Sequence, residues 1–236
     1  MNLIATITSS IDYVRSFFTK WLDWLILMIL LIIPIVDFIV FGYFVKVLRD
    51  SASSKSPPKI EGYMEMFING LLAFITLLIY SIPAIILSAG LIFFPSIAYI
   101  VFIVIVALIL FVFGFMAIVH MFKKKSFGKA FAFNEIFDAI MKIGLLRYIA
   151  FLVIYLIAGV IVVLVVIVLR MIPFVGVVIG VIVALAATVL IMTSMHRTIG
   201  LLYDSAMGIG GPVAPVMAPA PSTPAPGTPP PAPPLT

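Results

Sequence analysis

The sequence contains no cysteine, and only 10% of its 236 residues are charged. The first absence excludes disulfides, thiolate metal sites and thiol nucleophiles. The second is far below the roughly 25% of charged residues in an ordinary soluble domain. Hydrophobic residues, in contrast, make up 64% of the chain. Most side chains must therefore contact lipid or other helices rather than water.

Charge is also absent over long continuous stretches. The longest runs from Ile68 to Phe122 and contains no Asp, Glu, Lys or Arg, although His120 lies near its end. Because about 20 helical residues cross a hydrocarbon layer about 30 Å thick, this run is too long for one span and long enough for two. It predicts a helical hairpin with spans at about 68–92 and 96–122.

A second hairpin is predicted further along the chain, with spans at about 149–171 and 173–195 and Pro173 at its turn. Every fourth residue of the last span is small, and a stripe of this kind lets a neighbouring helix approach closely. We expect the stripe to serve a contact within the chain. It consists of Gly176, Gly180, Ala184 and Thr188.

The first apolar stretch, 22–48, allows two interpretations because Pro34 interrupts it and Asp37 lies near its middle. It is either a single kinked span or a short hairpin bent at Pro34. Proline removes a helical donor and clashes with the preceding turn, and a charge at the bilayer centre costs about 2.5 to 3.5 kcal/mol. Both effects favour the hairpin. Pro83, in the second stretch, is a further candidate helix break, as is Pro173 in the third.

Each hairpin is preceded by a segment with apolar residues at helical spacing, at 3–21, 60–67 and 129–146. Amphipathic helices of this type lie in the membrane interface. The fold class predicted for residues 1–207 is therefore an all-α polytopic membrane domain, in which three interfacial helices each precede a hydrophobic hairpin. Residues 208–236 are rich in proline and alanine and carry no charge, so they are predicted to be a disordered tail.

The basic residues predict the orientation of the chain. Three hairpins would place every Lys and Arg except Arg170 on one side, and segments rich in these residues remain cytoplasmic. A single first span would move Arg15 and Lys20 to the other side. We expect a multi-pass protein of the cell membrane with its long loops and C-terminal tail in the cytoplasm. The expected partners are the lipid bilayer and a membrane or cytoplasmic protein, and no nucleic acid is expected.

Two charged residues are candidates for a polar site in the membrane. Asp37 either forms an ion or proton site beside the break at Pro34 or caps the helix that starts there. Arg170 either binds lipid phosphate, pairs with Asp37, or extends to the headgroups. The sequence has no glycine-rich phosphate loop, metal triad or Ser-His-acid set, so neither a cofactor nor enzyme activity is expected.

Several short segments resemble a known family. They are Pro34 to Tyr43 with Arg49, the pattern Pro58, Ile60, Glu61, Tyr63, Glu65, Met66, Phe67, Gly70 and Leu71, then Phe133 to Phe137, and Ile172-Pro173. Together they resemble the prokaryotic, mostly archaeal membrane proteins catalogued as domain of unknown function 4013. The resemblance covers about residues 5–205 and implies the membrane architecture, but it implies no activity because the family is uncharacterised.

The leading function hypothesis is a non-enzymatic membrane component that organises lipid or binds partner proteins. The alternative is a small transporter or channel that uses Asp37 at the helix break. A transporter should bring polar groups from several spans to one depth, and the predicted spans contain few. Asp37 also stands where family members often have asparagine, which weakens the case for a required charge.

Overall fold

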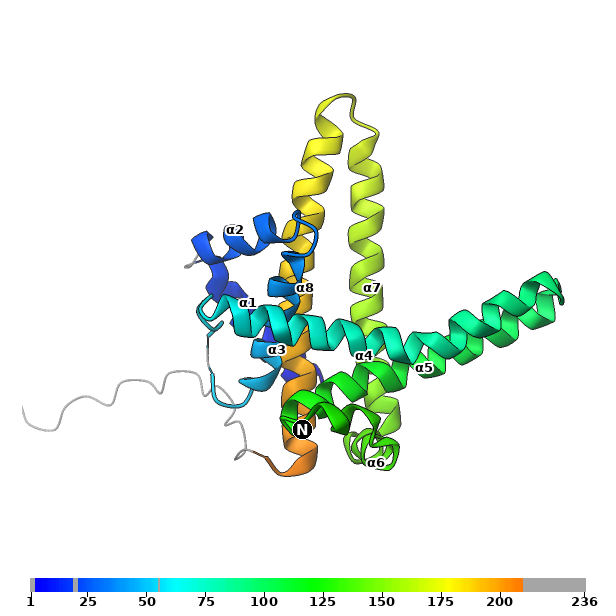
Figure 1. Ribbon diagram of the computed structural model, residues 1–236. Helices are drawn as coiled ribbons and strands as arrows, with labels where there is room; N and C mark the ends of the chain where they lie inside the picture. Colours follow the sequence, from blue (N-terminus) through cyan, green and yellow to red (C-terminus); the bar gives the residue numbers. More distant parts are fainter. Residues whose placement is uncertain (1–2, 19–20, 55, 210–236) are drawn as a thin grey trace, which may run out of the picture.

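The computed structural model describes residues 3–18, 21–54 and 56–209 (Figure 1). These residues form helices and no strand, which confirms the all-α class predicted from the sequence. The α-helices are α1 Leu3–Arg15, α2 Trp21–Leu30, α3 Asp37–Arg49, α4 Tyr63–Ala89, α5 Ile97–Lys123, α6 Phe133–Ile143, α7 Leu145–Arg170 and α8 Val175–Met207. The 3₁₀ helices are η1 Ser16–Phe18, η2 Gly90–Ile92 and η3 Phe127–Phe131. The predicted disordered tail lies outside the described residues from position 210 onward.

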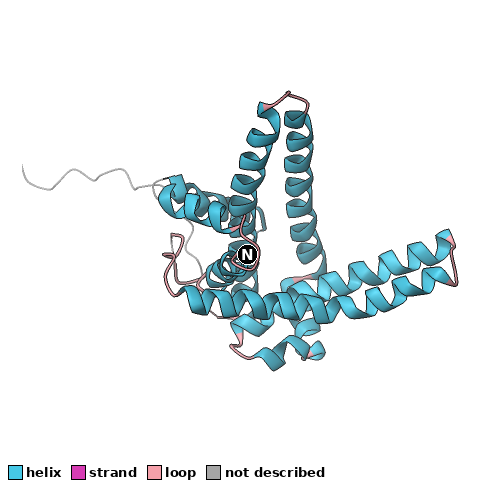
Figure 2. Cartoon of the chain, turned by 45° about the horizontal axis from the view of Figure 1, so that its top comes forward, coloured by secondary structure: helices cyan, strands magenta, loops and turns pink. Residues whose placement is uncertain are grey.

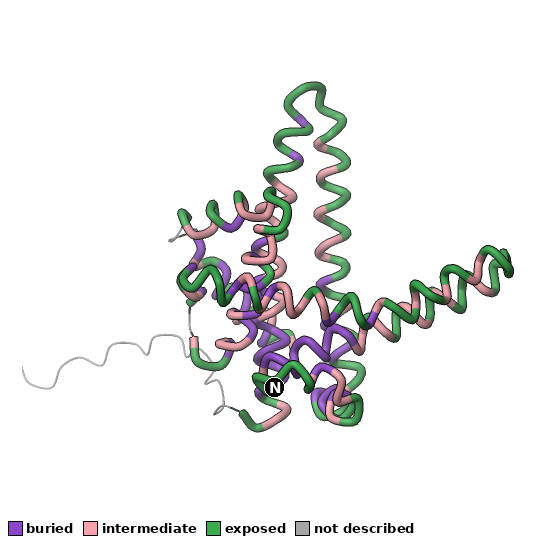
Figure 3. Tube along the Cα trace, viewed as in Figure 1, coloured by how far each residue is buried: buried purple, intermediate pink, exposed green. Residues whose placement is uncertain are grey.

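Four helices in the described part of the chain are long and apolar enough to cross a membrane, namely α4 extended by η2, α5, α7 and α8. They pair as two hairpins, α4–α5 and α7–α8, which extend in different directions from a shared region (Figures 1 and 2). We call residues 81–113 the first arm and residues 156–188 the second arm. Within both arms only Gly176 and Gly180 are buried (Figure 3).

The remaining described residues form what we call the base, where the two hairpins begin. Helices α1, α3 and α6 and the C-terminal part of α8 meet there, and Figure 3 shows the buried residues concentrated in this region. The largest fully buried side chains, among them Tyr43, Tyr148 and Tyr203, all belong to it. The hydrophobic core of the protein is therefore located in the base and not along the arms.

The first apolar stretch forms two short helices, α2 and α3, on either side of a turn that contains Pro34. They have 10 and 13 residues, or about 15 and 20 Å at 1.5 Å per residue. Neither is long enough to cross a hydrocarbon layer of about 30 Å. The chain therefore bends at Pro34 instead of continuing as one straight span.

The turns at Pro34 and Pro173 share a backbone conformation. The residue after each proline has a positive φ, 74° at Ile35 and 61° at Phe174, which is uncommon for bulky side chains. In both turns the residue before the proline accepts a backbone hydrogen bond of 3.1 Å from the N–H four residues later. The similarity of Ile33–Val36 to Ile172–Val175 thus extends from sequence to geometry.

Three details differ from the sequence-based expectation. Pro83 does not break a helix, because α4 continues through it; membrane helices tolerate proline where local adjustments satisfy the freed carbonyl. The expected interfacial helix at 60–67 is not a separate element, since Gly62 has a left-handed φ of 77° and Tyr63 already begins α4. The last span does not end near Met195, because α8 continues to Met207.

Glycines allow close contacts between helices, as two examples show. A Cβ added at Gly42 of α3 would lie 1.7 Å from the carbonyl oxygen of Met66 in α4. A Cβ at Gly176 would lie 2.0 Å from the carbonyl oxygen of Leu169 in α7. In the predicted small-residue stripe the two glycines thus face α7, whereas Ala184 is half-buried and Thr188 is exposed.

Candidate functional site in the polar base

The C-terminal part of α8 carries the largest group of buried polar side chains in the described chain. These residues lie in the interior of the base and contact α1, α5, α7 and the segment after α3, and three of them belong to the part of α8 beyond Met195. They are Thr193, Ser194, Arg197, Thr198 and Asp204. The polar base is therefore organised around one helix.

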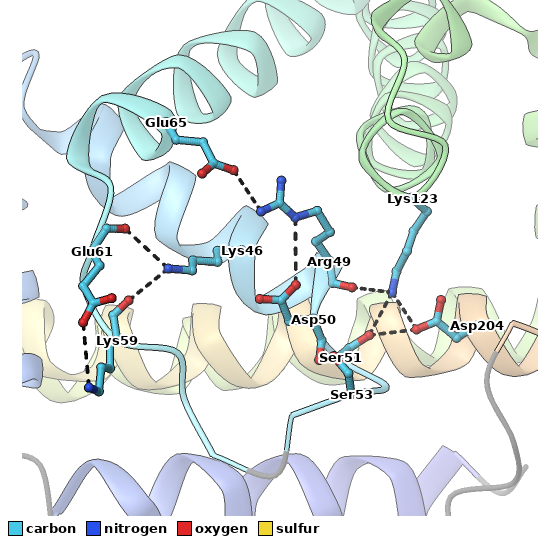
Figure 4. A network of polar contacts seen from close by, with 10 residues as sticks. All are labelled: Lys46, Arg49, Asp50, Ser51, Ser53, Lys59, Glu61, Glu65, Lys123 and Asp204. Carbon is cyan, nitrogen blue, oxygen red and sulfur yellow. Dashed lines mark hydrogen bonds and ion pairs between the residues drawn. The ribbon is translucent and has the colours of Figure 1, made fainter.

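Asp204 forms a buried ion pair with Lys123 of α5. The distance from Lys123 Nζ to Asp204 Oδ2 is 2.6 Å, and both side chains are 5% exposed. Lys123 also donates to Ser51 Oγ at 2.9 Å, and Ser51 Oγ donates to Asp204 Oδ2 at 3.0 Å (Figure 4). Buried charges are tolerated only when they are paired and hydrogen-bonded. This pair consequently joins α5, α8 and the end of α3.

Arg197 joins α8 to α1 and to the segment that follows α3. Its Nη1 donates to the carbonyl oxygens of Ser54 at 2.7 Å and of Ser51 at 3.4 Å. Its guanidinium carbon lies 3.9 Å from the centre of the Tyr13 ring, a cation–π contact. Burial raises the pKa of Tyr13 to about 12 although Arg197 opposes the shift, so the phenol remains neutral and keeps its proton.

Hydroxyl groups connect α7, α8 and α1. The Tyr155 hydroxyl lies 2.7 Å from Ser194 Oγ and 2.8 Å from Thr198 Oγ1. Thr198 in turn donates to Ser10 Oγ at 2.9 Å. Since apolar helices gain little by leaving lipid for each other, interhelical hydrogen bonds of this kind help to specify their positions.

His120 links α5 to α8 and to α6. Its Nδ1 lies 2.8 Å from the Tyr203 hydroxyl, and its Nε2 lies 3.0 Å from Glu135 Oε2. A neutral imidazole satisfies both partners, by accepting from Tyr203 and donating to Glu135. Hydrogen bonds from Lys129 and His120 hold the pKa of Glu135 below its usual value. The carboxylate of Glu135 is thus stabilised in its charged form.

A more exposed set of ion pairs joins α3 to the beginning of α4 (Figure 4). Arg49 Nη2 lies 2.9 Å from Glu65 Oε1. Lys46 donates to the carbonyl oxygens of Lys59 at 3.1 Å and Glu61 at 3.4 Å. Because exposed pairs contribute little individually, these contacts orient the loop more than they stabilise it.

The structure does not bring the two sequence candidates together. Asp37 is the first residue of α3, but its side chain makes no hydrogen bond within the described chain, and its buried Oδ1 has no partner. The expected cap is therefore not formed. Arg170 ends α7 at the tip of the second arm, where its stem packs near Gly180. No ion pair joins Asp37 and Arg170 in the described structure.

Sequence reasoning missed Asp204, Lys123 and Tyr155, which the tertiary structure places at the centre of the base. A signal for part of the site does exist. Arg197 and Asp204 are seven residues apart, which places them on one face of a helix two turns apart. That spacing would have indicated a polar face if α8 had been extended past Met195. The partner Lys123 has no local signal, because it is one of three consecutive lysines.

Within the described residues no group of three or more His, Asp or Glu side chains is arranged to hold a metal ion. A family model described as "Protein of unknown function (DUF4013)" matches residues 25–171, more than half of the chain. This match confirms the resemblance found in the sequence, and it runs from α2 to the tip of the second arm. No curated protein and no solved structure matches the chain significantly.

Proposed function

Because the chain belongs to the DUF4013 family, which is described only as of unknown function, we propose its function from its own structure. We propose a non-enzymatic membrane component that binds other membrane proteins through its two arms. The observation that carries the proposal is the exposure of the arms: among their residues only Gly176 and Gly180 are buried. In a packed helical bundle each helix would bury a stripe of apolar side chains against its neighbours.

The arms offer apolar surfaces that something in the membrane must cover. Leu108 of α5 is 59% exposed and Leu156 of α7 is 66% exposed. Gly159 of α7 has no other atom within 4 Å of an added Cβ. Lipid chains can cover such an apolar surface, but a small residue such as Gly159 favours the close approach of another helix. A partner helix therefore has a particular advantage over lipid at this part of α7.

The divergence of the arms is compatible with one bilayer. A helix of 27 residues such as α5 is about 40 Å long, and it fits a hydrocarbon layer of about 30 Å when it tilts by about 40°. Two hairpins that lean in opposite directions can both span while they diverge as in Figures 1 and 2. Their outer ends would then remain separate and accessible to partners.

The base holds the two arms in fixed positions relative to each other. Its buried charges, such as Lys123 and Asp204, neutralise one another across different helices, and this fixes where each hairpin begins. Such internal pairing supports a structural role for the polar network. It is the basis for proposing that the protein is not an enzyme.

Photo-cross-linking in native membranes tests the proposal. A photoreactive phenylalanine analogue replaces Phe102 or Phe111 on the first arm, or Leu156 on the second, all of which are exposed. The matched control is Phe115 of α5, which lies in the base and is only 8% exposed. We expect discrete protein adducts from the arm positions and none from Phe115. If no arm position on either hairpin gives a protein adduct, the proposal is wrong.

We further propose that the base faces the cytoplasm, which the distribution of basic residues supports. The absence of cysteine allows single cysteines to be labelled in intact cells with a membrane-impermeant reagent. Ser9→Cys in α1 should remain unlabelled, and Met171→Cys at the tip of the second arm should be labelled. Labelling of Ser9→Cys without labelling of Met171→Cys would show that the base faces the outside of the cell instead.

A transporter remains the second candidate because of one observation at Asp37. Its Oδ1 is buried without a partner among the described residues, beside the helix break at Pro34. Ion flux in reconstituted vesicles tests this function with the variant Asp37→Asn. Loss of flux with normal insertion would support transport, whereas unchanged flux would exclude a role for this carboxylate.

A further inference from the structure

The described basic residues fall into two groups according to their contacts. One group pairs with carboxylates or backbone carbonyls: Arg15, Lys46, Arg49, Lys59, Lys123, Lys129 and Arg197. The side chains of the other group have no hydrogen-bond or ion-pair partner within the described chain: Lys124, Lys125, Lys142, Arg147 and Arg170. Four of the five unpaired cations lie between positions 124 and 147: two before α6, one in its last turn and one in the first turn of α7.

The same segment exposes large apolar side chains. Phe133, Phe137 and Met141 recur every four residues along one side of α6 and are 58%, 51% and 52% exposed. Leu146, just after α6, is 83% exposed. Another side of α6 is already buried in the base through Ile136, Ala139, Ile140 and Ile143. Phe133 and Phe137 also contact the rings of Tyr80 and Phe113 in the first hairpin, but more than half of each residue stays exposed. The exposed strip is therefore a second apolar surface, which lies beside the first hairpin.

The acidic groups of the segment leave its positive charge in excess. Glu135 is engaged by Lys129 and His120. Asp138 is exposed and forms no ion pair in the described structure, although it lies one turn before Lys142. Against this one free carboxylate stand the four unpaired cations. The surface is therefore complementary to a partner that carries negative charge.

We propose that the segment 124–147 is a docking surface for anionic phospholipids, which we call the α6 rim. Lys124, Lys125, Lys142 and Arg147 contact the phosphate headgroups, and the strip from Phe133 to Met141 with Leu146 contacts the upper acyl chains. A phospholipid joins an anionic headgroup to apolar chains and so matches both parts of this surface, whereas a free phosphate would leave the exposed strip in water. This inference concerns a different surface from the arms and does not depend on their binding partner proteins.

The test uses the full chain in phosphatidylcholine vesicles that contain a minority of phosphatidylglycerol. Spin-labelled forms of the two lipids report the preference of the protein surface for the anionic one. The rim variant is K124Q/K125Q/K142Q/R147Q. The control variant R15Q/K46Q/K59Q/R170Q removes the same net charge from three paired cations and from Arg170 at the far end of the second arm. Size-exclusion profiles and resistance to protease show that both variants are folded.

A cation near an anionic membrane surface contributes about fivefold in affinity. We therefore expect the preference of the rim variant for phosphatidylglycerol to fall at least about fivefold, and that of the control variant to fall less than about twofold. An unchanged preference in the rim variant would overturn the proposal. An equal loss in both variants would overturn it as well, because net charge alone would then explain the preference.

Two further measurements separate lipid from other anionic partners. The variant M141S/L146S keeps every charge and should also lower the preference, since the strip contributes to binding; no change in this variant would contradict a lipid site. Inorganic phosphate should weaken the preference no more than sodium chloride of the same ionic strength. If phosphate abolishes the preference at that ionic strength, the rim binds free anions and the proposal is wrong.

Discussion

In the base, helices from distant parts of the sequence bury Tyr43, Tyr148 and Tyr203 around a network of charges and hydroxyls. In the arms, long apolar helices bury only Gly176 and Gly180. Helix α4 passes through both regions: it contributes the buried Met66 and Tyr80 to the base, and beyond Tyr80 it contributes no buried residue. Helix length therefore does not distinguish the two regions, since one long helix contributes to both.

Polar content is what distinguishes them. The arms contain one charged residue, Arg170, whereas the base contains the Lys123–Asp204 pair and the contacts of Arg197. In lipid an apolar side chain gains nothing from leaving one apolar neighbour for another, so van der Waals packing and hydrogen bonds decide which helices associate. The helices of this protein therefore converge where polar groups can meet.

The largest effect is expected from Asp204→Ala, which leaves Lys123 buried without its counter-ion. Removing one partner of a buried pair costs about 3 to 5 kcal/mol, and thermal unfolding of the purified protein in lipid nanodiscs measures the loss. Replacing both residues, in K123M/D204L, should restore most of the stability. A single variant as stable as the wild type would show that the ion pair does not hold the base together.

The second prediction concerns the arms. Val163→Lys places a charge in the apolar part of α7 and should make the apparent free energy of insertion less favourable by about 2.5 to 3.5 kcal/mol. The fraction of α7 inserted into microsomal membranes measures the effect. Met171→Lys at the arm tip is the control and should insert normally, because a lysine there reaches the headgroups. If Val163→Lys inserts as well as the wild type, residue 163 does not lie in the hydrocarbon layer and the prediction is wrong.

Glycine substitutions compare the two regions directly. Gly42→Ala in the base should destabilise by about 1 to 3 kcal/mol, because the new Cβ would meet a backbone carbonyl at 1.7 Å. Gly159→Ala in the second arm meets no atom within 4 Å and should stabilise α7 by up to about 1 kcal/mol. The melting temperatures of the two variants measure these opposite effects. If Gly159→Ala destabilises the protein as much as Gly42→Ala does, the second arm is packed as tightly as the base.

The smallest effect is expected from pH, through Glu135. Its pKa in the folded protein lies below the ordinary value of 4.5, so its contribution to stability is complete above pH 4.5 and is lost as the pH falls through the folded pKa. The difference in melting temperature between the wild type and Glu135→Gln should therefore become smaller as the pH falls below 4.5. A difference that is independent of pH would show that the charge of Glu135 is not involved.

The candidate site was less predictable than the helices. The uncharged run from Ile68 to Phe122 was sufficient to predict the α4–α5 hairpin, because hydropathy and length are local properties. Asp37 is identifiable as a candidate polar site for the same reason, because an isolated charge in an apolar run is also a local property. The Lys123–Asp204 pair was not predictable, since its members are separated by 81 residues and each lies among other polar residues at the end of a helix.

The membrane environment, the helical class and the approximate spans thus follow from local stretches of sequence, because each depends on the transfer of one segment from water to lipid. The folded chain is needed to show that α8 continues into the base, that its polar residues meet α1, α5 and α7, and that the arms diverge. These features depend on contacts between distant segments. In an apolar solvent such contacts depend on the geometry of packing and hydrogen bonding, and hydropathy does not encode that geometry.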